Sequence, residues 1–359
     1  MRKLSVRELT SGQPAADRVA LLSLWFKGHN NPRHAELLPR LERLDACLLT
    51  LPDARIPRGL GYRAFMRSKP LVQNSIFRPA ARRYRNLLTL DFEQLARWPN
   101  AAVMEADDPF FTPRELELLR SPSLRAYVVT AEHAARRYEA LGVDKPWVVI
   151  PQGINLEAAT PELRREAAAR KRPGEVVLGW MAAHLLTDGD RNADNPLYNI
   201  DHLLELWEGI RARVPHARLW LIGGPSERVR KRLQGRDDIE LIGRLPRAEA
   251  LATAAAFDVA PYARTADQGI RAAKVAEFIG LGVPTVSYDY EVTANLRETG
   301  AGVLVPDAAS FVEAVAHLLT TDAARQELAA AALRAGRELD WNVLARRFAV
   351  EVLDRYLPA

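Results

Sequence analysis

Apolar runs of strand length recur along the chain, and they constrain its fold more than any other feature. The first run, Val19–Phe26, is uninterrupted, as in a strand that is covered on both faces. A glycine-containing loop and a helical pattern follow it, and further runs lie at Ala46–Leu51, Ala101–Ala106 and Ala126–Thr130. The alternation restarts at Val176–Met181 and continues through the second half. This order predicts an α/β protein with two Rossmann-like doubly wound domains.

Length and composition set the limits of what the chain can be. Its 359 residues are enough for two domains of ordinary size, each with its own core. The single cysteine, Cys47, lies in an apolar run, so we expect a core residue and a reducing compartment. No apolar run reaches the length of a membrane span and the N-terminus shows no signal-peptide pattern, so the cytoplasm is the expected location.

The stretch from residue 269 to residue 287 predicts a short helix, a glycine stop and a buried strand. Gly282 stands where a helix C-cap belongs, and Pro284 precedes the strand Thr285–Ser287. Lys274 and Glu277 are three residues apart and therefore share one face of the helix. Two interpretations stay open: an ordinary surface ion pair, or an anion site at the start of a helix.

This stretch resembles the donor-binding core of GT-B nucleotide-sugar glycosyltransferases, most closely the retaining family-4-like group. The resemblance rests on Ala256–Pro261, on Lys-x-x-Glu with Gly-x-Pro-x-Val, and on Val149–Asn155 at the end of the first half. It implies two domains that face each other across a cleft. It also implies that Glu277 holds the ribose hydroxyls and that Lys274 meets the donor diphosphate. The chain departs from many members at Gly269, where they carry a second glutamate.

The resemblance implies further donor contacts. A basic residue is expected near the diphosphate, and Arg191 is the cation in the long loop 182–198. Gly28 and His29 follow the first strand and are expected to reach the phosphates or the sugar. Arg244 and Leu245 follow another strand and are expected to lie against the nucleobase.

Asp107 and Asp108 stand at the C-terminal end of the strand Ala101–Ala106. In the resembling family an acidic residue or a histidine near this place faces the acceptor, so these aspartates are candidates for handling the acceptor hydroxyl. The alternative is that one of them caps the helix Pro113–Leu119 or fixes the turn.

The segment from Arg55 to Arg85 carries nine basic residues, no acidic residue and scattered aromatic residues, among them Phe77 and Tyr84. It is either a solvated insertion or a surface that meets an anionic acceptor or a membrane. A nucleic-acid partner is disfavoured, because no binding motif accompanies the charge and the net charge is only +5.

These observations predict a glycosyltransferase that moves a sugar from a nucleotide diphosphate to a hydroxyl acceptor, with retention implied by the family. The expected domains are residues 1–158, residues 159–340 and a C-terminal helix, 341–359, that returns to the first domain. No cofactor or metal is expected, although Asp188 and Asp190 have the spacing of a metal clamp. The acceptor is expected to be anionic or lipid-linked, at the inner membrane face. The alternatives are a hydrolysing sugar-nucleotide epimerase and a non-catalytic sugar-nucleotide-binding protein.

Overall fold

The computed structural model describes residues 1–11, 14–26, 31–51, 64, 67–71, 73–90, 92–96, 101–107, 109–191, 193, 198–264 and 272–359. The chain divides into two compact units, one of residues 1–151 and 341–359 and one of residues 152–340. The first unit therefore ends at Pro151 rather than at residue 158, and the chain returns to it at Trp341.

The first unit is built on one parallel sheet in the order β1-β3-β2-β4-β5-β6-β7. Its strands are β1 (Arg2–Lys3), β2 (Val19–Phe26), β3 (Leu44–Leu51), β4 (Asn86–Thr89), β5 (Ala101–Glu105), β6 (Leu124–Val129) and β7 (Trp147–Val149). The order reverses between β2 and β4, which makes the C-terminal ends of these strands the expected place for a ligand.

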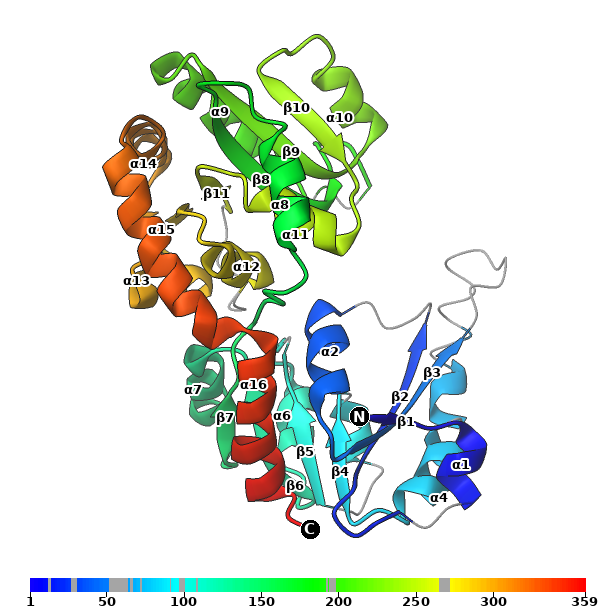
Figure 1. Ribbon diagram of the computed structural model, residues 1–359. Helices are drawn as coiled ribbons and strands as arrows, with labels where there is room; N and C mark the ends of the chain where they lie inside the picture. The colour runs from blue at the N-terminus through cyan, green and yellow to red at the C-terminus, as the bar shows by residue number, and fades with distance from the viewer. Residues whose placement is uncertain are drawn as a thin grey trace. The chain divides into compact units, whose positions relative to one another are not determined.

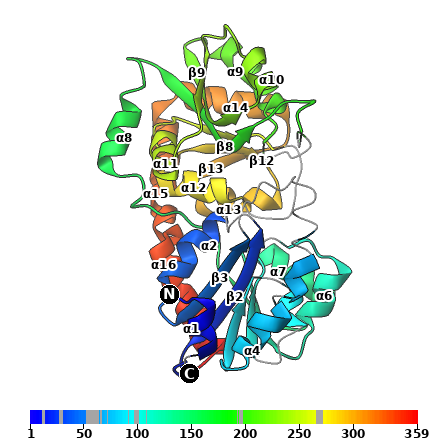
Figure 2. The same cartoon turned by 90° about the vertical axis from the view of Figure 1, so that its right-hand side faces the viewer.

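Helices cover both faces of this sheet. The described ones are α1 (Val6–Ser11), α2 (Pro32–Leu37), η1 (Leu38–Arg40), η2 (Gln73–Phe77), α4 (Arg78–Ala81), α5 (Phe92–Leu95), α6 (Pro113–Leu119), α7 (Glu132–Ala140), α16 (Trp341–Arg347) and η5 (Phe348–Asp354). Val19 and Leu21 pack toward α16, which lies beside α2 (Figure 1), whereas Ala20 and Leu22 pack on the opposite side. Figure 2 shows the sheet between α2 with α16 and the group α4, α6 and α7. The prediction of a strand covered on both faces is confirmed, and Cys47 is a buried core residue.

The second unit is also built on parallel β-strands. Its strands are β8 (Val176–Leu185), β9 (Ala217–Pro225), β10 (Ile239–Gly243), β11 (Ala260–Tyr262), β12 (Thr285–Tyr288) and β13 (Gly302–Val305). They form the sheets β10-β9-β8 and β11-β12-β13, which a parallel bridge from Leu178 to Val259 joins into one six-strand order. The order reverses between β8 and β11, so the switch point of this unit lies there.

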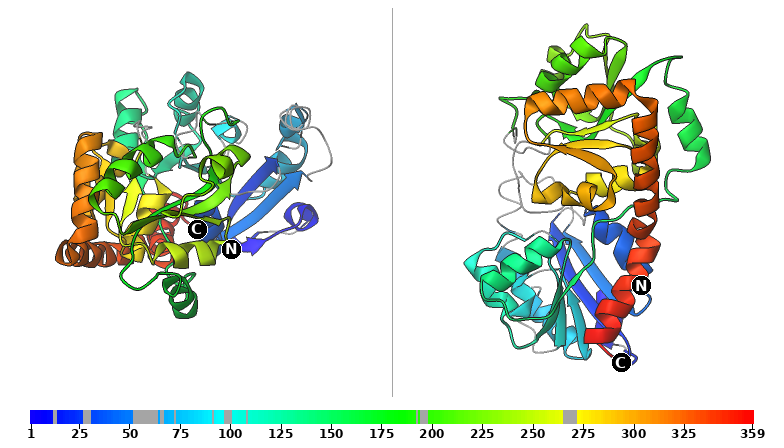
Figure 3. Two further views of the ribbon diagram at one scale, coloured as in Figure 1. Left: turned by 90° about the horizontal axis from the view of Figure 1, so that it is seen from above. Right: turned by 90° about the vertical axis from the view of Figure 1, so that its left-hand side faces the viewer.

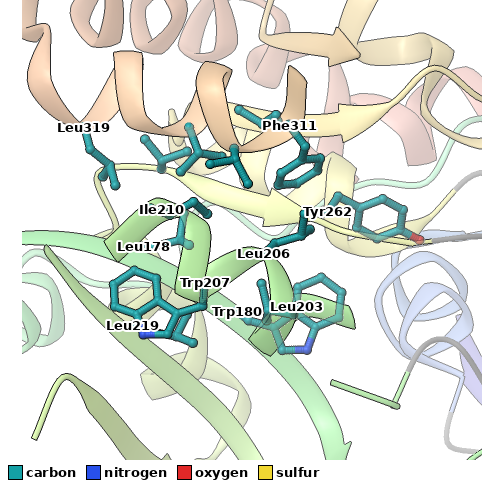
Figure 4. Close-up of a cluster of buried hydrophobic side chains, with 14 of the residues drawn as sticks. Leu178, Trp180, Leu203, Leu206, Trp207, Ile210, Leu219, Tyr262, Phe311 and Leu319 are labelled. Carbon is teal, nitrogen blue, oxygen red and sulfur yellow. The ribbon is translucent and has the colours of Figure 1, made fainter. Parts of the chain in front are cut away.

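The helices of the second unit also lie on both faces of its strands. The described ones are α8 (Pro161–Ala168), α9 (Asp201–Arg213), α10 (Glu227–Arg232), α11 (Arg247–Ala254), α12 (Ala273–Leu281), η3 (Glu291–Thr293), α13 (Ala294–Thr299), α14 (Ala308–Thr320), α15 (Asp322–Gly336) and η4 (Arg337–Leu339). Side chains of α9 and α14 share one hydrophobic core, part of which Figure 4 shows. The helices α14 and α15, orange in Figure 3, follow each other around the outside of this unit.

Strand β8 is longer than the sequence predicts. It was expected to end at Met181, but its pairing with β9 resumes at His184 and Leu185 after a register shift. The loop that follows is closed by backbone hydrogen bonds between Leu186 and both Tyr198 and Ile200. Helix α8 begins at Pro161 and is capped by Thr160, whose side chain accepts a hydrogen bond from Leu163 N.

Helix α12 and strand β12 match the expectation for this stretch. The helix ends at Gly282, whose φ of 74° lies in the left-handed region that glycine adopts without a steric penalty. Gly280 lets the helix approach the chain at Ile154 closely, since a Cβ there would lie 2.3 Å from Ile154 Cγ2. Ile154 N donates a hydrogen bond to Leu339 O, which joins the segment that begins the second unit to the segment that ends it. Helix α12 packs against this junction at Ile154.

The described part of the basic segment contributes to the core of the first unit. Phe77 is fully buried, and the Tyr84 hydroxyl donates to Asp45 Oδ2 at 3.0 Å. These two aromatic residues therefore cannot contact an acceptor, whereas Leu71 is 67% exposed and Arg78 and Arg82 are exposed as well. Within the described residues, no helix has the length and apolarity to cross a bilayer.

Candidate active site

Glu277 is a buried carboxylate in the second turn of α12. Its side chain is 3% exposed, and Oε1 accepts a hydrogen bond of 2.5 Å from Arg247 Nη2. Arg247 is the first residue of α11, so this ion pair joins the starts of two helices. The Glu277 carboxylate is therefore not part of a surface ion pair, which was one of the two interpretations left open by the sequence.

Lys274 lies one turn earlier on α12 with its ammonium group against an aromatic ring. Nζ is 4.0 Å from the ring centroid of Trp180 in β8, within the range of a cation–π interaction. Burial lowers the pKa of Lys274 to about 7; Glu277 acts in the opposite direction, and Arg264 lowers the pKa further. An anion bound near this amine would favour its charged form.

The residues around Lys274 come from the switch point of the second unit. Trp180 is in β8, and Tyr262 ends β11, with 6.0 Å between their ring centroids. Arg264 follows two residues later and is 5% exposed. Strands β8 and β11 and helix α12 thus place aromatic rings, two cations and one paired carboxylate where doubly wound domains bind ligands.

The other residues of this unit that were expected to contact the donor are more exposed than Glu277. Arg191 is exposed in the loop after β8, and Arg244 is exposed just beyond β10, next to the half-buried Leu245. Asp190 accepts hydrogen bonds from Thr187 N and Ser226 Oγ, so its carboxylate holds the loop in place. The described residues contain no group of three or more His, Cys, Asp or Glu side chains arranged to hold a metal ion.

In the first unit, Asp107 lies beyond β5 and contacts the start of α2. Its Oδ2 accepts a hydrogen bond of 2.5 Å from Asn31 Nδ2 and lies 3.8 Å from His34 Nε2. Asn31 also caps α2, because its Oδ1 accepts from Arg33 N at 2.9 Å. Asp107 does not cap α6; that role belongs to Thr112, in a capping box with Glu115. The Asp107 side chain retains 15% exposure and is therefore accessible to a ligand.

A fully buried ion pair lies beside this carboxylate. Arg33 Nε bonds Glu105 Oε1 at 2.6 Å, and each side chain is 1% exposed. Arg33 Nη1 donates to Pro151 O at 2.7 Å, and its guanidinium lies 5.7 Å from the Trp341 ring centroid. Burial raises the pKa of Glu105, against the lowering effect of Arg33. Arg33 therefore contacts the last residue before the chain leaves the first unit and the first residue after it returns.

Several predicted residues lie outside the described part of the chain, namely Gly28, His29, Asp108 and Gly269. The sequence analysis missed Asn31, His34 and Arg247, as well as Trp180 and Arg264. Asn31 was detectable as a helix cap, because it precedes Pro32 at the first helical position. Its bond to Asp107 spans 76 positions, and no local pattern reveals such a pair.

Comparison with known proteins supports the assignment of the second unit as a glycosyltransferase domain. Residues 191–321 match the model of the family described as glycosyl transferases group 1. No curated protein sequence matches the chain.

Solved structures match nearly the whole chain at low identity. HepE from Anabaena, in complex with UDP, has a TM-score of 0.67 at 15% identity over 93% of this chain and 99% of its own. Sucrose-phosphate synthase from Thermosynechococcus elongatus has a TM-score of 0.65 at 14% identity over 93% and 98%. WaaG, a glycosyltransferase involved in lipopolysaccharide biosynthesis, has a TM-score of 0.63 at 12% identity over 95% and 100%. The predicted GT-B fold is thereby confirmed.

Proposed function

The chain is a glycosyltransferase of GT-B fold with a domain of the glycosyl transferases group 1 type, and we propose how it uses its donor and its acceptor. The donor is a nucleoside diphosphate sugar bound at the second unit. The observation that carries this proposal is the placement of Lys274 and Glu277 on one helix beside the switch point. HepE has been crystallised with UDP-glucose, so a UDP-sugar is the first donor to test.

Lys274 stabilises the departing diphosphate. As the bond between the anomeric carbon and the phosphate oxygen breaks, negative charge builds on that oxygen, and a nearby cation lowers the barrier. Glu277, held in place by Arg247, accepts hydrogen bonds from the ribose hydroxyls. No metal ion or cofactor takes part in this scheme, and transfer proceeds with retention of the anomeric configuration.

Asp107 handles the acceptor hydroxyl in the first unit. The new bond joins the acceptor oxygen to the anomeric carbon, and the proton of that hydroxyl has to leave. A partly exposed carboxylate that is oriented by Asn31 and adjoins His34 is suited to accept it.

We further propose an anionic or lipid-linked acceptor at the cytoplasmic face of a membrane. The support is the acid-free basic segment, in which Arg78, Arg82 and Leu71 are exposed. Each basic residue near an anionic surface contributes on the order of 1 kcal/mol. Co-sedimentation with anionic liposomes at low salt tests this, with Arg78, Arg82 and Arg83 changed to glutamine. The control changes the exposed Arg136, Arg165 and Arg228 instead, and equal liposome binding by both variants would leave a soluble acceptor as the better proposal.

Release of nucleoside diphosphate, measured with and without candidate acceptors, tests the function itself. A transferase releases it mainly when acceptor is present. A hydrolysing epimerase releases it without acceptor, and a binding protein does not release it at all. Lys274→Ala should slow release through loss of roughly 3 kcal/mol of transition-state stabilisation. Release by the parent in acceptor-free buffer at its full rate would favour the epimerase.

A further inference from the structure

Arg264 is a buried arginine whose guanidinium is only partly hydrogen-bonded. It lies just beyond β11, at the switch point of the second unit, and is 5% exposed. Nη1 donates to the Tyr262 hydroxyl at 3.3 Å, and Nε is buried with no hydrogen-bond partner. Among the described residues, none forms an ion pair with Arg264. A buried charge normally has a partner, so this guanidinium indicates that an anion occupies the site at some stage.

A second cation and a second unsatisfied donor lie in the same cluster. The Tyr262 hydroxyl is directed away from the other side chains labelled in Figure 4, and it is this hydroxyl that Arg264 contacts. Tyr262 packs near Trp180, on whose ring face the Lys274 ammonium rests. The buried Trp180 Nε1 also lacks a partner. Arg264 and Lys274 are close enough for the charge of one to lower the pKa of the other.

The carboxylate on this helix is not a partner of Arg264. Glu277 already bonds Arg247, which approaches it from α11. Arg264 therefore carries a buried charge that no carboxylate of the described residues offsets. A ligand with two adjacent negative groups can meet Arg264 and Lys274 together, whereas a neutral sugar would leave the Arg264 charge uncompensated.

From this geometry we infer that Arg264 binds the diphosphate of the donor together with Lys274, and that Trp180 is a positioning residue that holds Lys274 for this contact. The inference rests on the proposed function and adds to it a residue that sequence resemblance does not supply. It also replaces Arg191 in the role expected for a basic donor residue. Arg191 is exposed in a surface loop, where water screens its charge, whereas the charge of Arg264 acts at short range in a desolvated setting.

Arg264→Met separates an anion ligand from a structural residue. It keeps the length of the side chain and removes a buried charge, so the ligand-free protein should melt at the same or a higher temperature. Stabilisation by UDP, GDP, ADP, dTDP or inorganic pyrophosphate, whichever of these binds the parent, should fall, with affinity at least about 30-fold weaker by calorimetry. Arg264→Lys should retain part of the affinity, and Arg191→Gln is the control that should bind like the parent.

Two outcomes would overturn the inference. If Arg264→Met lowered the melting temperature and bound the nucleotides as the parent does, Arg264 would be a structural residue. If Arg191→Gln lost affinity and Arg264→Met did not, the loop arginine would be the diphosphate ligand. A parent protein that binds none of the five probes would instead contradict the proposed function.

Trp180 has its own test in the same assay. Trp180→Phe keeps an aromatic face for Lys274, and Trp180→Leu removes it. Loss of a cation–π contact should weaken nucleotide binding roughly 3- to 30-fold in the leucine variant and much less in the phenylalanine variant. Equal affinities for the two variants would mean that the ring does not position Lys274.

Discussion

The low pKa of Lys274 makes the stability of the second unit depend on pH in a way that one substitution should abolish. Burial lowers this pKa from an ordinary 10.5 to about 7. Between these two values the unfolded chain binds the lysine proton, whereas the folded chain has released it. The free energy of unfolding therefore rises with pH across this window, and it is lowest below about pH 7, where the folded protein must hold a charged amine in a desolvated place.

The size of the effect follows from the shift. Each pKa unit corresponds to 1.36 kcal/mol, so the full difference would be about 5 kcal/mol. Because the side chain keeps part of its surface exposed, we expect about half of that, on the order of 2–3 kcal/mol. Lys274→Met removes the titrating group, and the rise of stability with pH should shrink by this amount.

Urea unfolding of the parent and of Lys274→Met at several values between about pH 6.5 and pH 9.5 measures the difference, in which the other titrating groups cancel. Lys231→Met, on the exposed surface of α10, is the matched control. The affinity for UDP, or for another nucleotide that binds, should fall over the same range in the parent, because the diphosphate favours the charged amine. Parallel curves for the parent and Lys274→Met would refute the argument.

Three further substitutions and one chelation experiment test other parts of the protein. Glu277→Gln should weaken nucleotide binding by about 1–3 kcal/mol with a smaller effect on the turnover of bound donor, which equilibrium titration and kcat will separate. Asp107→Asn should leave nucleotide affinity unchanged and lower kcat for transfer by roughly 10²- to 10⁴-fold; a parent-like kcat would remove it from the mechanism. Gly280→Ala should lower the free energy of unfolding by about 1–3 kcal/mol, since the new Cβ would lie 2.3 Å from Ile154 Cγ2, whereas Gly224→Ala, with 3.5 Å to its nearest atom, is the control. EDTA should leave transfer activity intact, and a loss that magnesium restores would make Asp188 and Asp190 candidate ligands.

Local patterns predicted the parts of the fold that local physics determines. The uninterrupted apolar run of β2 requires burial on both faces, and the glycine stop of α12 requires the left-handed conformation that Gly282 adopts. The extension of β8 beyond Met181 was missed, because a register shift and two exposed residues hide the alternation. The aromatic residues of the basic segment were misjudged for a related reason, since Phe77 and Tyr84 carry no local sign that they enter a core.

The site depends on contacts between residues that are far apart in sequence, and these escaped prediction. Glu277 meets Arg247 across 30 positions, and the pairing follows from how α11 and α12 leave their strands rather than from any spacing. Trp180 reaches Lys274 because the strand order reverses between β8 and β11. The residue pattern did predict α12 as a helix that ends at Gly282, because that pattern is contiguous in the sequence. The resemblance led to Arg191 as the second cation, because a basic residue was expected in the loop 182–198 and Arg191 is the cation of that loop.

Two buried arginines show how the surroundings of one residue type separate structure from function. Arg33 in the first unit has a carboxylate at 2.6 Å and a backbone carbonyl at 2.7 Å, so its charge is compensated within the protein. Arg264 in the second unit is almost as buried, yet its hydrogen-bond partner is a neutral hydroxyl and its neighbour Lys274 is another cation. Removing the Glu105 carboxylate would leave the buried charge of Arg33 without its ion-pair partner. Loss of one partner of a buried pair should destabilise the first unit by about 3–5 kcal/mol. In the second unit the ligand-free protein carries such a cost at Arg264, and the proposed binding of the diphosphate would relieve it. Part of the donor's affinity would then come from this relief.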